Sequence, residues 1–363
     1  MGVANILREL LKIILGKPQK TETNVTSGRD SVVSKDMFIG RKQVNIQNIY
    51  YEVPPEMRKL IEKSEERVDE IVKKSKTSIE TPKPRLKSDS EDYKQIVSLL
   101  KSERSQESKI RIRSIYHSSA DRLAQLQAIL VLADWFDASR DALEDIISLC
   151  DEGVRLAESL GMKRERAILI AHKGSFLSFK FSLQDMDTAF KIQIEKRINI
   201  YSMNELEAKE VSERIQKLDK DSEDCFIEAE RTALELNSLE VLAYVYLMVG
   251  TAAGIRFNHL NHFGIPRAEF EKQLAKRALM AAKRIYEQMS DEIGAAYALH
   301  NMANVLRNFG PEDKEEAKIL VKQVIKIAEK HNEQNLLGSA NGLLKRIESG
   351  KIPKYTQGEK FEL

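Results

Sequence analysis

The stretch that decides the fold is IYEQMSDEIGAAYALHNMA, residues 285–303. Its first residues are the end of one helical pattern of apolar residues. A short polar segment at Ser290 and Asp291 follows, and then a second, alanine-rich helical pattern begins. Small side chains let two helix backbones approach closely. The stretch therefore predicts the end of one helix, a short turn, and a second helix that packs tightly on its neighbours.

Three other stretches of the chain repeat this pattern. LAESLGMKRERAILIAHKG begins at Leu156, 129 residues earlier, and matches it in residue type at Glu158, Ala167 and Gly174. Further copies are IAEKHNEQNLLGSANGLL, from residue 327, and ALELNSLEVLAYVYLMVG, from residue 233 with an ambiguity of one residue. Recurrence of one helix–turn–helix unit predicts a helical-repeat fold.

The clearest unit, residues 296–330, resembles the tetratricopeptide repeat (TPR), a family of antiparallel helix pairs stacked into a superhelix. The resemblance is carried by apolar and small positions of the first helix and then the second: Leu299, Met302, Ala303, Leu306, Phe309, Gly310, Ala317, Val321 and Val324. The copies start 77, 52 and 42 residues apart, farther than the roughly 34 residues of the family. A generic α-solenoid is therefore the structural alternative.

The sequence divides into four parts. Residues 93–350 are expected to form an all-α, TPR-like solenoid in which the charged segment 183–222 extends two helices beyond the repeat. Residues 1–55 are an N-terminal appendage of an amphipathic helix (3–15) and a β-prone hairpin (within 31–53, turning near Gly40). Because a lone hairpin is marginally stable, this part is expected to dock or to self-associate. Residues 56–92 read as a helix and polar linker, and residues 351–363 as a tail.

The candidate site lies on one face of the helix that contains residues 297–310. That face is polar or aromatic at every position, whereas the opposite face is apolar. The TPR resemblance implies that ligands bind the inner face formed by the first helix of each pair. It places a peptide-binding surface at Tyr297, His300, Asn301, Asn304, Arg307, Asn308, His172 and Ser175, with Ser178 and Phe179 from the copy at residue 156 and Tyr244, Met248 and Thr251 from the copy at residue 233. The alternatives are a solvated face, or amides that bond to the neighbouring repeat.

Composition and motifs narrow the functional classes. The formal net charge of +2 is too small to produce an overall positive potential that would attract nucleic acid. The nucleotide-binding and hydrolase motifs are absent from the sequence. Cys150 and Cys225 are expected to be reduced thiols of a cytoplasmic protein. The segment 257–266, with its two histidines, is expected to be a loop rather than a metal site, and Trp135 a core residue. No run of 18 apolar residues is present, so no membrane span is expected.

The sequence therefore predicts a non-enzymatic interaction scaffold without cofactor or metal, which binds a peptide or protein segment and has the option of a homo-oligomer through its N-terminal part. Contact of residues 3–15 with a membrane surface is the less favoured role for the amphipathic helix. The alternative function is a regulatory or sensor subunit of a signalling or defence system that oligomerises or docks through that N-terminal segment.

Overall fold

The computed structural model describes residues 37–39, 42–44, 88–101, 105–136, 141–198, 205–262, 267–307 and 311–349. The chain divides into two units, Met1–Lys35 and Asp36–Leu363, and every described residue belongs to the second. The amphipathic helix predicted at 3–15, the helix and linker at 56–87 and the tail lie outside the described residues. The boundaries predicted for these parts stay predictions.

The described part of the chain is an all-α body preceded by one small hairpin. Its eleven helices are α4 (Glu91–Lys101), α5 (Gln106–Ser118), α6 (Arg122–Asp134), α7 (Leu143–Ser159), α8 (Lys163–Ile198), α9 (Glu205–Glu235), α10 (Leu239–His262), α11 (Arg267–Gln288), α12 (Glu292–Leu306), α13 (Pro311–His331) and α14 (Gln334–Glu348). The strands β1 (Met37–Ile39) and β2 (Lys42–Val44) pair antiparallel, with Met37 opposite Val44. Both lie inside the β-prone segment, and the docking role predicted for that segment stays a prediction.

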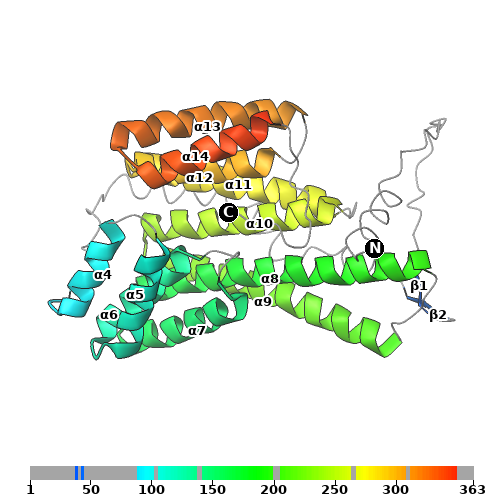
Figure 1. Ribbon diagram of the computed structural model, residues 1–363, viewed down its shortest axis with the longest axis horizontal. Helices are drawn as coiled ribbons and strands as arrows, with labels where there is room; N and C mark the ends of the chain where they lie inside the picture. Colours follow the sequence, from blue (N-terminus) through cyan, green and yellow to red (C-terminus); the bar gives the residue numbers. More distant parts are fainter. Residues whose placement is uncertain are drawn as a thin grey trace, which may run out of the picture. The chain divides into compact units, whose positions relative to one another are not determined.

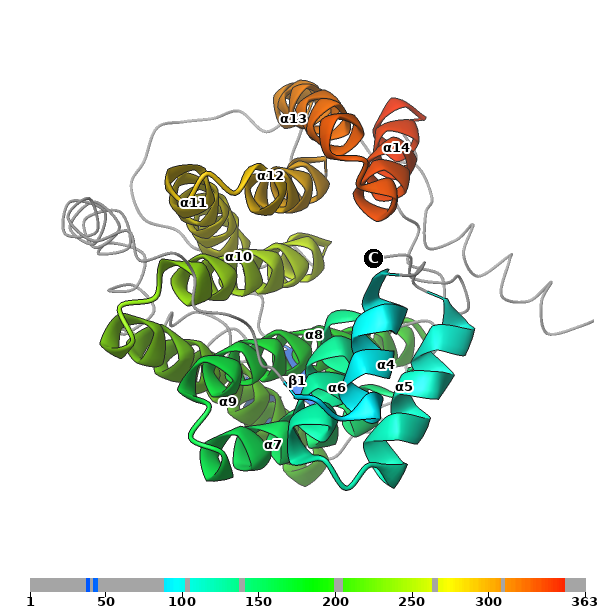
Figure 2. The same ribbon diagram turned by 90° about the vertical axis from the view of Figure 1, so that its left-hand side faces the viewer.

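The helices form two layers, as Figures 1 and 2 show. Each helix packs against its neighbours in the chain, and the even-numbered helices also pack against one another in the order α4, α6, α8, α10, α12, α14. Within the described residues, every substantial contact between helices that are not chain neighbours joins two even-numbered helices. We call these the even-numbered layer. The odd-numbered helices α7, α9, α11 and α13 flank it.

Four junctions between helices share one backbone geometry. Gly161, Asn237, Ser290 and Asn332 have φ between +49° and +69°, and no other described residue has positive φ. At each junction the next residue donates its N–H to a carbonyl five residues earlier, from Met162 to Ala157 at 2.8 Å through Glu333 to Ala328 at 2.9 Å. This is the Schellman ending of a helix.

These turns are compatible with the predicted helical-repeat fold, and they correct the phase of its copies. The four left-handed residues are 76, 53 and 42 residues apart. The ambiguous copy is therefore in phase when it begins at Thr232 rather than Ala233. The three intervals are unequal because the helices between the turns differ in length, from 36 residues in α8 to 15 in α12.

Small residues allow the predicted close approach of helices. A Cβ atom at Gly174 would lie 3.0 Å from the ring of Phe226, and one at Gly250 would lie 2.5 Å from Leu279 Cγ. At Gly254 it would lie 2.3 Å from Val305 Cγ2. A larger side chain at either of the last two positions requires the Leu279 or Val305 side chain, or the helix that carries it, to move.

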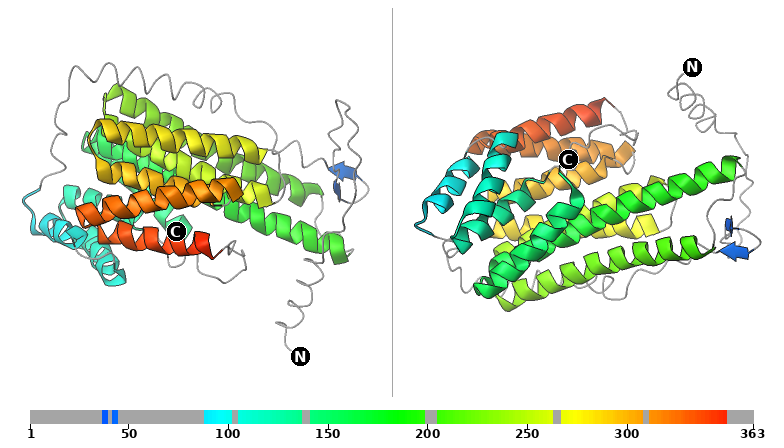
Figure 3. Two further views of the ribbon diagram at one scale, coloured as in Figure 1. Left: turned by 90° about the horizontal axis from the view of Figure 1, so that it is seen from above. Right: turned by 60° about the horizontal axis from the view of Figure 1, so that its bottom comes forward.

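The charged segment after residue 182 continues two helices, as expected. The two longest helices, α8 with 36 residues and α9 with 31, run side by side in Figures 1 and 3. Leu177 and Phe181 of α8 form a small apolar cluster with Leu218 of α9. The side chains of residues 183–212 lie outside the described residues.

The apolar interior consists of two large clusters. The first contains residues from Ala167 to Ile347 on α8 through α14, and the second contains residues from Tyr93 to Phe179 on α4 through α8. Trp135 is 5% exposed in the second cluster, which confirms the prediction for this residue. Among the described residues, those of α8 alone contribute buried side chains to both clusters, since Ala167 belongs to the first and Leu169 to the second.

A buried ion pair joins three helices. Arg256 of α10 and Glu271 of α11 are both 0% exposed, with Nε and Oε2 3.0 Å apart, and Arg256 Nη1 donates to Ser178 Oγ of α8 at 2.6 Å. The segment Leu239–Asn258 of α10 is long and apolar enough to cross a membrane, but 67% of it is buried against the rest of the protein. That burial is typical of a core helix.

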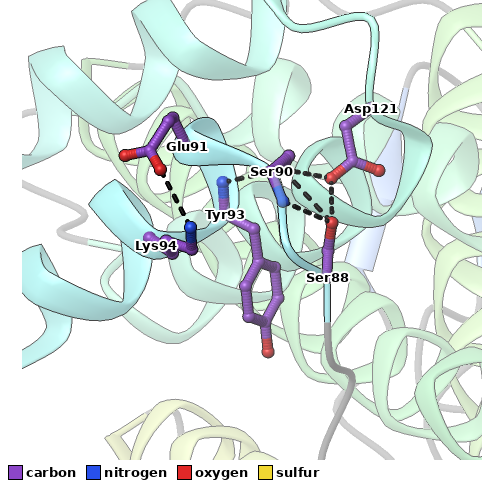
Figure 4. Close-up of polar contacts among 6 residues, drawn as sticks. All are labelled: Ser88, Ser90, Glu91, Tyr93, Lys94 and Asp121. Atoms are coloured by element: carbon purple, nitrogen blue, oxygen red, sulfur yellow. Dashed lines mark hydrogen bonds and ion pairs between the residues drawn. The ribbon is translucent and has the colours of Figure 1, made fainter.

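A carboxylate fixes the start of the described body. Asp121 caps α6 by accepting the N–H of Leu123 at 2.9 Å, and it also accepts hydrogen bonds from the hydroxyls of Ser88, at 2.6 Å, and Ser90 (Figure 4). Ser90 Oγ accepts the N–H of Tyr93 in the first turn of α4. Burial raises the pKa of Asp121, but these hydrogen bonds outweigh it and hold the pKa below its usual value. The cluster ties α4 to α6.

One expectation for the body is wrong. The segment 257–266 is not a loop over its first six residues, because α10 continues through His262. Phe257 is 4% exposed, so the helix is extended by an apolar residue that packs in the interior. The side chains of His259 and His262 lie outside the described residues.

Candidate binding face

The polar face predicted on α12 lies in the even-numbered layer. Tyr297, His300, Asn301, Asn304 and Arg307 are all half-buried, whereas the residues of the opposite face are buried: Ala295, Ala296, Ala298, Leu299, Met302, Ala303, Val305 and Leu306. Asn308 lies outside the described residues. The division of the helix into two faces, read from its sequence, is confirmed at these positions.

Part of this face bonds to adjacent helices of the same layer. Asn301 Nδ2 donates to Thr251 Oγ1 of α10 at 3.0 Å, and His300 Nε2 lies 3.1 Å from Ser339 Oγ of α14. His300 Nδ1 and Asn301 Oδ1 are 3.4 Å apart. The alternative that amides bond to the neighbouring repeat therefore holds for Asn301. A polar ladder crosses α10, α12 and α14.

Burial keeps His300 neutral near pH 7. Burial lowers the pKa of His300; hydrogen bonds with Asn301 and Ser339 act against this, and the positive charges of Arg346 and Arg307 lower the pKa further. A neutral imidazole holds one proton and one lone pair, so it can serve one donor and one acceptor. Its role here is to fix α12 against α14.

The second part of the predicted site is aromatic and more deeply buried. His172 of α8 is 5% exposed, and its Nε2 lies 2.6 Å from the hydroxyl of Tyr244 on α10. The His172 ring stacks on Phe176, with centroids 5.8 Å apart, and Phe176 meets Phe136 at 4.9 Å. Ser175, also of α8, is half-buried. The sequence-predicted residues His172 and Tyr244 are thus brought together, but as partners of each other.

Burial sets the charge state of His172. It lowers the pKa to about 4, against a small opposing effect of Asp134. His172 is therefore neutral near pH 7 and cannot act as a cation toward a ligand. This part of the even-numbered layer is therefore aromatic, and Asp134 at the end of α6 is the charged residue that acts on His172.

Four residues of the face were missed by sequence reasoning: Phe136, Phe176, Ser339 and Arg346. Ser339 and Arg346 lie on α14, 39 residues after His300 and Arg307 in the chain. Counted from the left-handed residue of each turn, Arg346 occupies the same position as Asn304, Thr251 and Ser175. This shared position after the turn is the signal that could have identified Arg346 from the sequence. Its use required the correct position of each turn.

The two thiols are unsuited to nucleophilic chemistry. Burial raises the pKa of both Cys150 and Cys225, in the latter case to about 12. The thiolate, which is the reactive form, is therefore not populated near neutral pH. Within the described ranges, no three residues of the types His, Cys, Asp and Glu gather in a way that could hold a metal ion.

No protein-family model matches the chain, and no curated protein matches its sequence.

Proposed function

We propose that this chain is a non-enzymatic interaction scaffold whose repeats form a TPR-like superhelix with the even-numbered layer as its inner face. The support is geometric. Four turns repeat one backbone geometry, and the even-numbered helices follow one another as the first helices of stacked pairs do. The intervals of 76, 53 and 42 residues depart from the family norm, so the superhelix is irregular.

The proposed ligand is an extended peptide or protein segment that lies across α8, α10, α12 and α14. One observation carries this proposal. Half-buried polar and aromatic side chains, including Ser175, Tyr244, Thr251, Tyr297 and Asn304, recur on successive helices of one layer. Side chains of this kind combine partial exposure with fixed positions, which is what a recognition surface needs. We place the protein in the cytoplasm, in keeping with its two free cysteines.

The test is a peptide-display selection with the full chain as bait. Peptides enriched on the wild type should lose at least about tenfold in affinity, or about 1.4 kcal/mol, for the variants Ser175→Arg and Tyr297→Arg. The matched control is Ile319→Arg, at a residue of α13 in the flanking layer that is 58% exposed. Circular dichroism and thermal unfolding check that each variant is folded.

Two outcomes would overturn the proposal. One is a selection that enriches no peptide on the wild type. The other is a set of enriched peptides that binds Ser175→Arg and Tyr297→Arg as well as it binds Ile319→Arg. The alternative role, a regulatory subunit that assembles through residues 1–55, is a separate prediction for a segment outside the described ranges. Sedimentation mass with and without that segment tests it.

A further inference from the structure

Two serine hydroxyls hold the first helix of the even-numbered layer in place. Ser88 Oγ donates to Asp121 Oδ2 at 2.6 Å, and Ser90 Oγ donates to the same oxygen (Figure 4). Both serines precede α4, whereas Asp121 is the N-cap of α6 and accepts the N–H of Leu123 through its other oxygen. One carboxylate therefore joins the residues before α4 to the start of α6.

Few other contacts fix α4. Within the described residues, its substantial contacts are with α5 and α6 alone. Tyr93 and Ile96 are 9% and 0% exposed in the second apolar cluster, and Val97 packs against that cluster while only partly buried. With 11 residues, α4 is too short to be stable as an isolated helix. Its position therefore depends on this apolar contact and on the bonds to Asp121.

The residues that follow Ser88 are acidic and accessible. Asp89 and Glu91 are exposed, and Ser88 and Asp92 are half-buried. Carboxylates thus stand one, three and four residues after Ser88. A protein kinase that binds its substrate through basic side chains can hold such carboxylates by charge-assisted hydrogen bonds. The neighbouring Ser90 has no carboxylate three residues after it, so the pattern favours Ser88 as the acceptor.

We propose that Ser88 is a phosphoryl-acceptor site for a serine kinase that recognises acidic sequences, and that its phosphorylation releases α4 from α6. In this step Ser88 Oγ attacks the γ-phosphorus of a nucleoside triphosphate. The bond from that phosphorus to the bridging oxygen breaks, the nucleoside diphosphate leaves, and the hydroxyl proton passes to the general base of the kinase. Ser88 thereby loses the proton that it donates to Asp121.

The charge of Asp121 makes the modified contact unfavourable. Hydrogen bonds, including those from Ser88 and Ser90, hold the pKa of Asp121 below its usual value, so this carboxylate is charged near pH 7. Phosphorylation replaces a donor to this carboxylate by a group with a charge of about −1.5 to −2. Like charges in contact repel one another. Release of α4 would uncover the side chains of Tyr93 and Ile96, and the even-numbered layer would then begin at α6.

The test of the site uses the full chain, a serine kinase that recognises acidic sequences, and magnesium ATP. Fragmentation in the mass spectrometer should place a phosphate on Ser88. Glu91→Gln should slow this modification at least about tenfold, the effect of losing one hydrogen bond between charged groups. Ser98→Ala, at an exposed residue of α4, is the matched control and should leave the rate unchanged. Absence of phosphate at Ser88, or an unchanged rate in Glu91→Gln, would overturn the site.

Hydrogen exchange tests the release of α4. Phosphorylated wild type and Ser88→Asp should both exchange the amides of α4 at least about tenfold faster than the unmodified wild type. Ser98→Asp adds a negative charge on the exposed side of α4 and should exchange as the wild type does. In an Asp121→Asn background, which keeps a good N-cap for α6, Ser88→Asp should have a much smaller effect because the repulsion is gone.

The outcomes are independent of the proposed function, because the proposed peptide surface lies on α8, α10, α12 and α14. Equal acceleration of α4 exchange by Ser88→Asp with and without Asp121→Asn would overturn repulsion as the cause of release. Unchanged exchange of α4 in the phosphorylated wild type would overturn the release itself. Neither result bears on the peptide selection, and an empty peptide selection leaves the Ser88 site in place.

Discussion

At the residue scale, the four repeated turns depend on a backbone conformation that costs free energy for most residues. An L-residue with a side chain loses about 1–2 kcal/mol in the left-handed region, and glycine does not. Only Gly161 meets this requirement without cost, while Asn237, Ser290 and Asn332 adopt positive φ with side chains attached. Asparagine tolerates this region better than serine does. The turn geometry is therefore imposed by the packing of the helices on either side.

Two glycine substitutions should have opposite signs. At Gly161, φ is +69° and no atom lies within 4 Å of an added Cβ, so Gly161→Ala acts on the backbone alone and should destabilise the protein by about 1 kcal/mol. Gly338 lies inside α14, also in open space, so Gly338→Ala should stabilise it by about 0.5–1 kcal/mol. Urea unfolding measures both. Equal signs for the two variants would contradict this explanation.

His172 should make stability fall in mild acid. Burial lowers its pKa from 6.5 to about 4 in the folded protein, so the unfolded chain binds a proton that the folded protein does not. The stabilisation is complete above pH 6.5 and is lost as the pH falls from 6.5 toward 4, by up to about 3 kcal/mol. The variant His172→Gln lacks the imidazole that binds this proton in the unfolded chain. The difference in unfolding free energy between the wild type and His172→Gln should shrink over this pH range, and a constant difference would contradict the assignment.

At the element scale, α10 is held by close contacts that only glycine permits. A Cβ at Gly254 would overlap Val305 Cγ2 at 2.3 Å, and the Cβ of Val305 itself lies at 3.4 Å. The conflict therefore comes from the branched end of one side chain on α12. Removal of that end should convert an overlap into an ordinary contact.

A double-mutant cycle tests this contact. Gly254→Ala should destabilise the wild type, because strain of about 1–3 kcal/mol exceeds the gain of up to about 1 kcal/mol in helix propensity. In a Val305→Ala background the same substitution should stabilise the protein, since only the propensity gain remains. Unfolding free energies of the four proteins give the coupling. A Gly254→Ala effect of the same sign in both backgrounds would show that α10 and α12 do not meet as described.

The elements that could be predicted from sequence are those with local signals. The four helix–turn–helix copies were found because alanine and glycine recur at matched positions after the turns, as at Ala167 and Ala296. The polar face of α12 was also visible as a periodicity. The partners of that face were not, because Ser339 and Arg346 reach it from 39 residues later in the chain.

Burial was the second quantity that the sequence concealed. His172 and Tyr244 were expected to line a ligand face, but their 2.6 Å contact uses the polar atoms of both side chains within the protein. Such pairing depends on the distance between α8 and α10, which the hydrogen bond from buried Arg256 of α10 to Ser178 of α8 helps to determine. The residue pattern of one helix does not predict the distance between that helix and another.

At the scale of the whole molecule, the division of the interior into two apolar clusters implies that the two ends of the helical stack can differ in stability. Buried side chains of α14 belong to the first cluster, and Trp135 belongs to the second. In a stack where each helix contacts only near neighbours, a defect at one end lowers the stability of that end first. The described helices have this arrangement, with α8 as the shared element.

The single tryptophan of the chain makes this property measurable. Ile129→Ala and Leu343→Ala each remove a side chain that is 0% exposed, from the second and the first cluster respectively, at an expected cost of about 2–5 kcal/mol. Ile129→Ala should lower the urea midpoint reported by Trp135 fluorescence. Leu343→Ala should lower the midpoint of the helical signal in circular dichroism and leave the fluorescence midpoint almost unchanged, because α14 can unfold without α6. If Leu343→Ala shifts the Trp135 fluorescence midpoint as far as Ile129→Ala does, the stack unfolds as one cooperative unit, and stability does not divide along its length.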